Sequence, residues 1–237
     1  MRTLIDGDPF AYQAAFSKTS VTEDDALELV DDLLYQALND VDPFWEDDDY
    51  TLFLTGSGNF RFEIAVSYPY KGTRQSAKPE FLPILRHHMI ENWSAVVSEG
   101  EEADDLIGIA STELYPSCVV VSIDKDMLQL PGTHYNPVKR TWTEVDEFGG
   151  LRFFYQQILM GDNADNIIGL SGVGPKKSER MLENLTTEEE LWDAVVQAYD
   201  GDIDRIIENG RLLWLRRFPG QLWTPPVVSE EAGDAKE

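Results

Sequence analysis

Short runs of apolar residues, several of them β-branched, alternate along the first half of the chain with longer stretches in which apolar residues recur at helical spacing. The longer stretches predict helices over Glu23–Leu38 and Asp104–Leu114. The short runs are typical of strands buried on both faces, and they lie at Thr3–Ile5, Tyr50–Leu54, Ala95–Ser98 and Cys118–Ile123. This alternation predicts an α/β fold with a mainly parallel, twisted sheet flanked by helices.

The pattern changes near residue 146, where the strand patterns stop and helical spacing continues alone. Helices are predicted over Leu151–Met160, Pro175–Leu185, Thr187–Tyr199 and Ile203–Leu215. We therefore expect an α/β core over residues 1–148 and a helical domain over residues 149–218. The remaining tail, 219–237, ends in acidic and small residues, and we expect it to be partly disordered.

The composition places the chain among globular proteins, because 42% of its 237 residues are hydrophobic and 11% are aromatic. No stretch approaches the roughly 18 consecutive apolar residues that a membrane-spanning helix needs. The single cysteine, Cys118, cannot form an internal disulfide, and the N-terminus lacks the pattern of a secretory signal. We therefore expect a soluble protein of a reducing cytoplasm, with no membrane partner.

The formal net charge of −25 opposes the usual expectation that proteins binding nucleic acids are basic. The acidic candidates named below account for only part of this charge, so much of it must lie on solvated surface. Positive charge gathers between the second and third predicted strands, at Lys71, Arg74, Lys78 and Arg86. Any attraction for an anionic partner must therefore be local rather than global.

Four acidic clusters recur where an α/β fold would bring them together. Three of them follow predicted strands, and the carboxyl ends of parallel strands are where such sheets bind ligands. The fourth follows an apolar helix. The clusters contain Asp6 and Asp8; Glu102, Asp104 and Asp105; Asp124 and Asp126; and Asp162 and Asp165.

Each cluster alone has an ordinary structural explanation, such as a turn, a solvated loop or an acidic first turn of a helix. Their joint occurrence favours a metal site. Mg²⁺ prefers oxygen ligands, and two such ions about 4 Å apart supply what phosphodiester hydrolysis requires. Without cations, carboxylates packed this closely would raise one another's pKa values by mutual repulsion.

A glycine-rich segment, Gly169–Lys177, follows the last acidic cluster. Its glycines, Gly172 and Gly174 among them, permit tight turns, and a proline suits the first position of the next helix. Exposed N–H groups at that helix start, with Lys176 and Lys177, would bind one DNA phosphate. An ordinary turn between two helices explains the same residues without any ligand.

Together these motifs resemble the 5′-nuclease superfamily, which includes flap endonucleases, the 5′-nuclease domains of bacterial DNA polymerase I and phage 5′-exonucleases. Glu102–Asp105, Asp124–Leu130 and Gly161–Asn166 match its three acidic signatures in order. The segment Gly169–Lys177 resembles its helix–three-turn–helix, and Tyr70–Arg74 resembles the basic part of its helical arch, expected here over about residues 69–91. Phage enzymes of the short-tailed coliphage type are the most similar in character.

The resemblance implies a two-metal 5′-3′ exonuclease and flap endonuclease of DNA replication with a PIN/5′-nuclease-like fold. It implies two Mg²⁺ ions, with Mn²⁺ as a substitute, and K⁺ at the helix–three-turn–helix. The implied catalytic residues are Asp6, Lys71, Arg74, Glu102, Asp104 and Asp124. The implied metal ligands are Asp6, Asp8, Glu102, Asp104, Asp105, Asp124, Asp126, Asp162 and Asp165. The implied DNA-binding residues are Tyr70, Lys71, Arg74, Gly172, Gly174, Lys176 and Lys177.

The implied partners are duplex DNA with 5′ ends or flaps, RNA–DNA hybrids and replication proteins, bound by a monomer in the cytoplasm, that of the host cell if a phage encodes the chain. One departure stands out. Family members carry another aspartate after the second strand, where this chain has Phe53–Arg61 without a carboxylate, leaving Asn59, a water or Asp8 as substitutes. A structure-specific DNA-binding protein with weakened catalysis is therefore an alternative, and an RNase of the related single-domain folds is a third reading.

Overall fold

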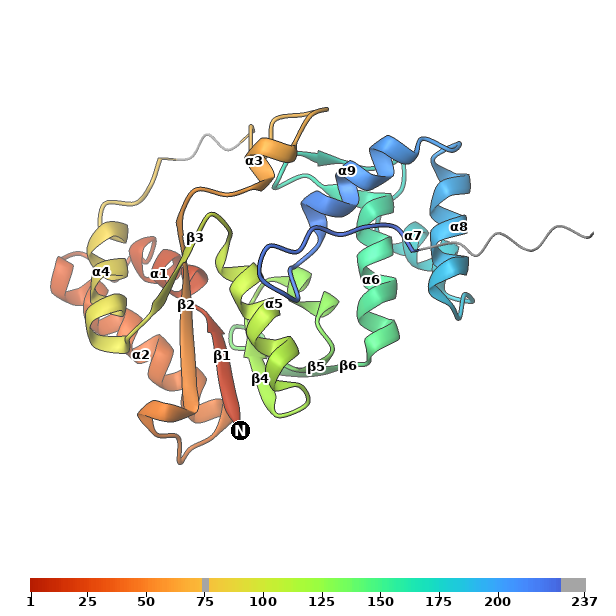
Figure 1. Ribbon diagram of the computed structural model, residues 1–237. Helices are drawn as coiled ribbons and strands as arrows, with labels where there is room; N and C mark the ends of the chain where they lie inside the picture. Colours follow the sequence, from red (N-terminus) through yellow and green to blue (C-terminus); the bar gives the residue numbers. More distant parts are fainter. Residues whose placement is uncertain (74–76, 227–237) are drawn as a thin grey trace, which may run out of the picture.

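The computed structural model describes residues 1–73 and 77–226, and its centre is a six-stranded sheet (Figure 1). The strands stand in the order β3-β2-β1-β4-β5-β6, and every neighbouring pair is parallel except β5 and β6. Their bounds are β1 Arg2–Asp6, β2 Tyr50–Ser57, β3 Val96–Glu99, β4 Cys118–Val121, β5 Gly132–Asn136 and β6 Thr141–Val145. The strand order reverses at β1, because β2 and β3 lie on one side of it and β4, β5 and β6 lie on the other. Ligands of such sheets bind at the carboxyl ends of the strands beside this reversal.

Alternate residues of the strands face two separate cores, as the pleat of a sheet requires. Ile5 on β1 and Leu54 on β2 pack with one set of helices, α1 Asp8–Ala15, α2 Glu23–Val41 and α4 Leu82–Trp93. Leu4 and Phe53 on the same strands face the opposite side and pack with α5 Ala103–Leu114. Helices on both faces bury the central strands β1 and β4 almost completely, which explains their nearly uninterrupted apolar sequences.

The hairpin of β5 and β6 was not among the predicted strands. Its second strand, β6, lies at the edge of the sheet and is exposed along most of its length, so its sequence has no apolar run that would indicate a strand. Short helical turns complete the core region: η1 Asp47–Asp49, α3 Arg61–Ile64 and η2 Lys125–Gln129.

Four helices beside the sheet form a second region, confirming the helices predicted after residue 146. They are α6 Glu147–Met160, α7 Pro175–Leu182, α8 Glu188–Ala198 and α9 Ile203–Leu213 (Figure 1). A small antiparallel pair, β7 Gly161–Asp162 and β8 Ile167–Ile168, interrupts them and corrects the expectation that strands end near residue 146. The chain then folds back, and Trp223 packs against Gly210, where an added Cβ would lie 2.4 Å from the indole ring.

The α/β class and the mainly parallel sheet are thus as predicted, with strand ends shifted by one to three residues. Residues 82–93, which include most of the second half of the expected arch, form α4, whose Leu85 and Met89 are buried against the core. No helix within residues 1–73 or 77–226 is long and apolar enough to cross a membrane.

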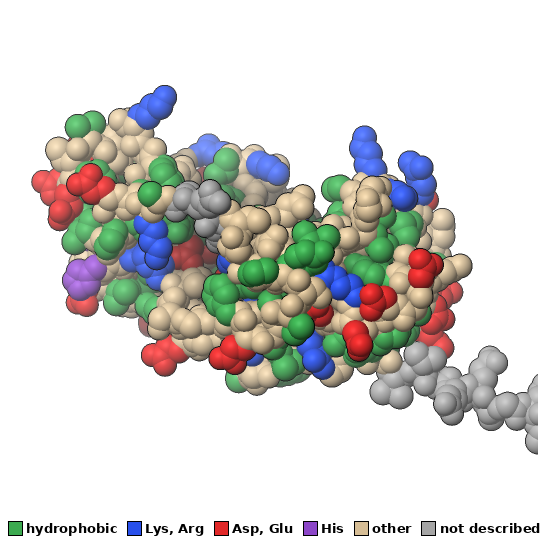
Figure 2. Space-filling model, turned by 90° about the horizontal axis from the view of Figure 1, so that it is seen from above, with side chains coloured by type: hydrophobic (Ala, Val, Ile, Leu, Met, Phe, Trp, Pro, Cys, Tyr) green, Lys and Arg blue, Asp and Glu red, His purple; other side chains and the backbone are tan. Residues whose placement is uncertain are grey.

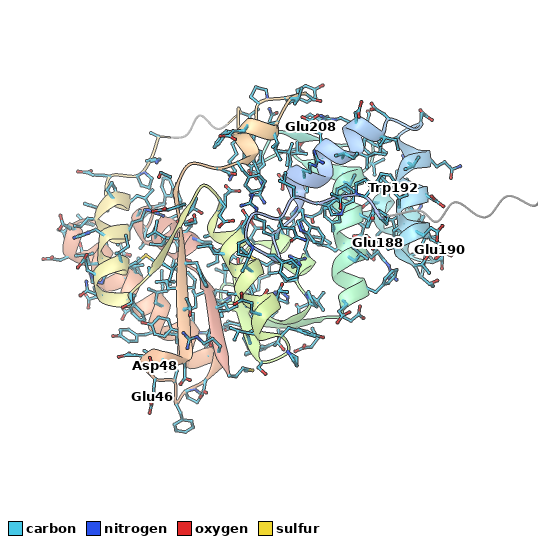
Figure 3. All side chains as sticks on the ribbon, in the orientation of Figure 1. Glu46, Asp48, Glu188, Glu190, Trp192 and Glu208 are labelled. Carbon is cyan, nitrogen blue, oxygen red and sulfur yellow. The ribbon has the colours of Figure 1, made fainter. Side chains whose placement is uncertain are left out.

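Much of the acidic surface lies away from the carboxyl ends of the strands. Glu46 and Asp48 project beside the start of β2, at the lower edge of Figure 3, and Glu188 and Glu190 lie at the start of α8. These groups account for part of the negative charge, and they do not line the pocket that opens at the carboxyl ends of the strands.

Candidate active site

A pocket of about 1090 Å³ opens at the carboxyl ends of the central strands. Acidic side chains at its walls come from β1, from the start of α1, from α5 with its preceding residue and from the turn between β4 and η2: Asp6, Asp8, Glu102, Asp104 and Asp124. Basic side chains line the same pocket: Lys71, Lys78, Arg86, Lys125 and Lys139. Figure 2, which looks down on this end, shows acidic side chains lying deep in a hollow between basic ones.

Three carboxylates lie close enough to repel one another across the pocket. The pKa of Asp6 is raised to about 7, chiefly by burial and also by the charges of Asp8 and Asp124, against a hydrogen bond from Ser122 that lowers it. Burial likewise raises the pKa of Asp104 well above its ordinary value, and Asp6 and Asp124 add to the shift. The structure therefore brings these predicted site residues together, and their shared negative charge is the kind that bound cations relieve.

Local turns fix two of these groups. The Ser122 hydroxyl donates to Asp6 Oδ2 at 2.8 Å and accepts from the backbone N–H of Asp124 at 3.0 Å. Asp124 in turn caps η2 by accepting from the N–H of Asp126 at 2.9 Å. The chain thus bends sharply after β4 and presents Asp124 beside the end of β1.

Glu102 and Asp165 are joined by the residues at the base of the expected arch. The Tyr70 hydroxyl lies 2.8 Å from Glu102 Oε2 and 2.7 Å from Asp165 Oδ2, and the ammonium of Lys71 pairs with Glu102. Lys71 adopts a left-handed backbone (φ 54°), with its N–H donating to the Asp165 carbonyl at 2.9 Å. A lysine held in this uncommon conformation is consistent with a functional position.

A second acidic group lies on the helical side. The pKa of Asp126 is raised to about 7, chiefly by burial and also by the charges of Asp124, Asp162 and Asp165, while Lys125 lowers it. Asp126 accepts from the Gln157 amide at 2.8 Å, and Asp162 accepts from the N–H of Ala164 at 2.6 Å. The charge of Asp124 in the first acidic group therefore affects the pKa of Asp126, although Asp126 lies on η2 and Asp162 on β7, away from the strands that carry the first group.

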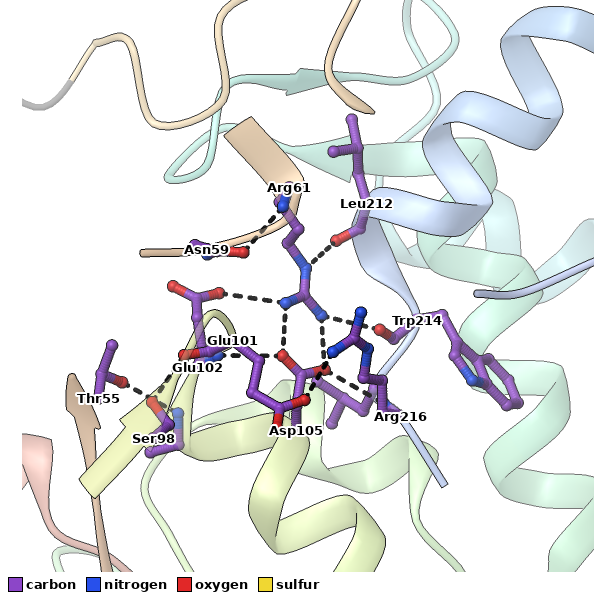
Figure 4. A network of polar contacts seen from close by, with 12 residues as sticks. Thr55, Asn59, Arg61, Ser98, Glu101, Glu102, Asp105, Leu212, Trp214 and Arg216 are labelled. Carbon is purple, nitrogen blue, oxygen red and sulfur yellow. Dashed lines mark hydrogen bonds and ion pairs between the residues drawn. The ribbon is translucent and has the colours of Figure 1, made fainter. Parts of the chain in front are cut away.

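Asp105 does not join either group, which corrects its inclusion among the metal ligands. Its fully buried carboxylate faces away from the pocket and binds both terminal nitrogens of Arg61, at 2.6 and 2.9 Å (Figure 4). It also accepts from the backbone N–H of Glu102 and of Arg216. With both oxygens engaged, Asp105 joins α3, α5 and the segment after α9.

Asp8 lines the pocket, but its oxygens are also engaged. Oδ2 accepts from the N–H of Thr55 at 2.9 Å, and Oδ1 pairs with the guanidinium of Arg86. Neighbouring Gly56 leaves no room for a carboxylate, because an added Cβ would lie 1.9 Å from the Ser98 carbonyl oxygen. Asn59 is no substitute either, since it accepts from the N–H of Arg61 at 2.9 Å and does not line the pocket.

The glycine-rich segment stands apart from the pocket. Gly172 has a left-handed backbone (φ 71°), and both it and Gly174 have open space where a side chain would lie. Lys176 and Lys177 are exposed in the first turn of α7, as the phosphate-site interpretation requires. Arg74, predicted to be catalytic and DNA-binding, lies outside the described residues.

The donor chemistry of the pocket suits a hard divalent cation, because its titratable walls offer carboxylate oxygens that repel one another. Within the described part of the chain, no three acidic, imidazole or thiol groups converge closely enough to hold an ion as they stand. Individual carboxylates instead have partners within the protein: Glu102 pairs with Lys71, Asp6 accepts from Ser122 and Asp126 accepts from Gln157.

Several residues that line the pocket or support the residues around it were not singled out from the sequence. Lys139 lines the pocket because it lies in the turn of the β5–β6 hairpin, which was not predicted. Turn-forming residues between two short runs of β-branched and aromatic residues could have indicated this hairpin. Arg61 was missed because nothing local marks a buried arginine. Arg216 and Arg217 are bound within the protein, to Glu101 and to the Gln129 carbonyl.

Among solved structures, the fold resembles that of the bacteriophage T5 flap endonuclease, determined in a pseudo-enzyme–product complex with DNA and metal ions. The two share 17% identity with a TM-score of 0.66, over 89% of this chain and 88% of that one. This likeness establishes an α/β fold of the flap endonuclease type.

Residues 1–152 match the family model of the 5′-3′ exonuclease N-terminal resolvase-like domain, so the chain belongs to that nuclease family. It is 28% identical over 211 residues to a 5′-3′ exonuclease of Mycoplasma pneumoniae, covering 78% of this chain and 72% of that protein. It is also 28% identical over 210 residues to the DNA polymerase I of Bacillus caldotenax, covering 79% of this chain. The chain spans only 24% of the length of that polymerase.

Proposed function

We propose that this protein is a divalent-metal-dependent 5′-nuclease that hydrolyses phosphodiester bonds of DNA, as a 5′-3′ exonuclease and a flap endonuclease. One observation carries the proposal: Asp6, Asp104 and Asp124 surround a single pocket at the carboxyl edge of the sheet, with cationic Lys71 at its wall. Membership of the 5′-3′ exonuclease family supports the same chemistry.

Two Mg²⁺ ions, or Mn²⁺ in their place, would be held by Asp6, Glu102, Asp104 and Asp124 and by Asp126, Asp162 and Asp165. When bound, such ions activate a water and neutralise charge on the transferring phosphoryl group. Asp8, with both oxygens engaged, and Asp105, paired with Arg61, are left out of this set.

The chain's own residues supply orientation and charge. The Tyr70 hydroxyl positions Glu102 and Asp165, and burial together with the Glu102 charge raises the Tyr70 pKa so that it remains a donor. Lys71 is paired with Glu102, and its ammonium would turn to the scissile phosphate once cations neutralise that carboxylate. Arg74 keeps the same proposed role from the family resemblance.

The helical region would bind the duplex beyond the cleavage site. Gly172, Gly174, Lys176 and Lys177 offer an open, cationic turn at the start of α7, suited to one phosphate and to K⁺ on main-chain oxygens. The proposed substrates are duplex DNA with 5′ ends or flaps and RNA–DNA hybrids. The proposed setting is phage replication in the host cytoplasm, with a monomeric enzyme beside other replication proteins.

A second candidate is a structure-specific DNA-binding protein that cleaves weakly or not at all. Gly56 favours it, because the close approach of Ser98 leaves no room there for a carboxylate. This candidate predicts binding to duplex ends with no turnover under any metal condition.

The test is hydrolysis of a 5′-labelled duplex and of a 5′-flap substrate in Mg²⁺, in Mn²⁺ and in EDTA, with Asp124→Asn beside the unchanged protein. The proposal requires short 5′ products that vanish in EDTA and in the variant. Binding without cleavage in every condition would favour the second candidate. Preference for single-stranded RNA over duplex DNA would point to the RNase reading instead.

A further inference from the structure

An arginine and an aspartate form an ion pair inside the pocket that the proposed metal chemistry does not use. Arg86 extends from α4, and its guanidinium pairs with Asp8 and donates to the carbonyl oxygen of Thr55 at the end of β2. Asp8 accepts from the N–H of Thr55 at the same time. Three elements that are distant in the sequence therefore fix one guanidinium in place.

This pair stands at the wall of the pocket rather than on the outer surface. Arg86 and Asp8 are 23% and 22% exposed, and both line the space that Asp6, Asp104 and Asp124 also line. Arginine keeps its charge in any protein environment. The β2 side of the pocket therefore carries a permanent cation next to Gly56, where no carboxylate fits.

The guanidinium has more N–H donors than its two recorded partners engage. Its planar fork matches the oxygens of a phosphate group, and a fixed fork loses less conformational freedom on binding than a mobile one. Lys71 and Lys78 line the same pocket, so Arg86 is, among the described residues, the third cationic side chain that lies between β2 and β3 in the sequence and lines this pocket. Because the chain has a net charge of −25, a polyanion would be attracted to these local cations rather than to the protein as a whole.

We propose that Arg86 is a phosphate-binding residue on the β2 side of the pocket, and that Asp8 positions it rather than holding a metal ion. The ligand is a backbone phosphodiester of a DNA strand entering between α4 and the acidic residues. This inference rests on the proposed function for the identity of the substrate, but it concerns binding and does not require cleavage.

A purely structural role is the competing explanation. If Arg86 only fastens α4 to β2, its removal lowers stability and leaves the affinity for DNA unchanged. Salt dependence separates the two, because each phosphate contact made by a protein cation contributes about −0.9 to the slope of log affinity against log salt for duplex DNA.

The experiment compares the unchanged protein with Arg86→Gln, using fluorescence anisotropy of a labelled duplex with a short 5′ overhang, in EDTA, across a KCl series. We expect the slope of Arg86→Gln to be shallower by about 0.9 and its affinity at moderate salt to fall roughly three- to tenfold. The matched control is Arg140→Gln, because Arg140 pairs with Asp40 at 3.7 Å outside this pocket. It should leave the slope unchanged.

An unchanged slope and affinity in Arg86→Gln would overturn the proposal, as would the absence of DNA binding by the unchanged protein at any salt. If Arg86→Gln does not fold, Arg86→Lys decides instead. It keeps the positive charge but loses the planar fork that pairs with Asp8 and Thr55, so the affinity should fall a few-fold with the salt slope unchanged, and unchanged affinity would again overturn the proposal. A protein that binds DNA but never cleaves it would refute the proposed function while leaving this inference standing.

Discussion

Asp104 and Asp105 are neighbours in the sequence, yet the protein treats them in opposite ways. Asp104 faces the pocket, where burial and the charges of Asp6 and Asp124 hold its pKa well above the ordinary value. Asp105 faces the interior and is fully buried, but Arg61 neutralises it through two hydrogen bonds. Burial would lower the pKa of Arg61, and the bonds and charge of Asp105 outweigh it and raise that pKa.

The difference teaches that burial alone does not decide the state of a carboxylate, because a cationic partner such as Arg61 offsets the cost of burying its charge. The two residues project on different sides of α5, because successive helical positions are rotated by about 100°. On one side the chain leaves charge unbalanced, which costs stability and creates a place for cations. On the other side of α5, Asp105 pairs with Arg61 and accepts from the N–H of Arg216, and so connects the α/β region to the segment after α9.

The sharpest contrast is catalytic. Asp104→Asn keeps the shape of the side chain but removes a charge from the pocket, so we expect DNA cleavage in Mg²⁺ to fall on the order of a thousandfold or more. Single-turnover hydrolysis of a 5′-flap substrate measures the loss, and anisotropy should show that the variant still binds the substrate. Cleavage within a few-fold of the unchanged protein would remove Asp104 from the proposed metal site.

The neighbouring substitution should instead affect folding. Asp105→Asn leaves the buried Arg61 with only the more distant Glu102, at 3.7 Å, as a counter-charge, and breaking a buried pair in this way costs about 3–5 kcal/mol. Urea unfolding measures the loss. Arg61→Met combined with Asp105→Asn should recover part of it, because no unpaired charge then remains. If Asp105→Asn were as stable as the unchanged protein, the pairing would not be the main role of Asp105.

The sequence indicated the α/β class, the acidic clusters and their order, because strand-end carboxylates and apolar periodicity are local signals. It could not separate Asp104 from Asp105, since their roles depend on Arg61, which lies 44 positions away from Asp105. Asp8 was likewise included among the metal ligands because its partner Arg86 comes from a distant helix. Long-range ion pairs leave no local pattern, so contacts of this kind had to come from the structure.

The raised pKa of Asp6 in the pocket also predicts how the stability of the protein depends on pH. Asp6 has a pKa of about 7 in the folded protein and an ordinary carboxyl pKa when unfolded, so its folded form holds a proton through the range between. The metal-free protein should therefore be stabilised near pH 4 to 5 and lose on the order of 2–4 kcal/mol of this contribution as pH rises through 7.

Thermal unfolding in EDTA from pH 5 to pH 8 measures this loss. Asp6→Asn should flatten the dependence relative to the unchanged protein, which separates this group from the general repulsion of an acidic chain. Mg²⁺ should restore stability at the higher pH by binding the ionised carboxylates. A metal-free protein that becomes more stable as pH rises through this range would contradict the unbalanced charge that we assign to the pocket.

A third carboxylate, Glu208 on α9, lies between these two extremes. Burial would raise its pKa, but hydrogen bonds from Ser67 and from the backbone N–H groups of Ser67 and Val66, together with Arg205, hold the pKa below the ordinary value. Figure 3 places Glu208 beside the segment that follows α3 and leads to Tyr70 and Lys71.

Glu208→Gln keeps the size of the side chain and removes the charge that these donors favour, so we expect a loss of about 1 kcal/mol in urea unfolding. That is smaller than the effect of Asp105→Asn, because backbone and hydroxyl donors, unlike Arg61, do not become unpaired buried charges when the carboxylate is removed. The matched control is Glu63→Gln on α3, for which no ion pair or side-chain hydrogen bond is recorded among the described residues. A loss of 3 kcal/mol or more would place Glu208 with Asp105 as a paired buried charge, its partner then being Arg205 at 3.1 Å.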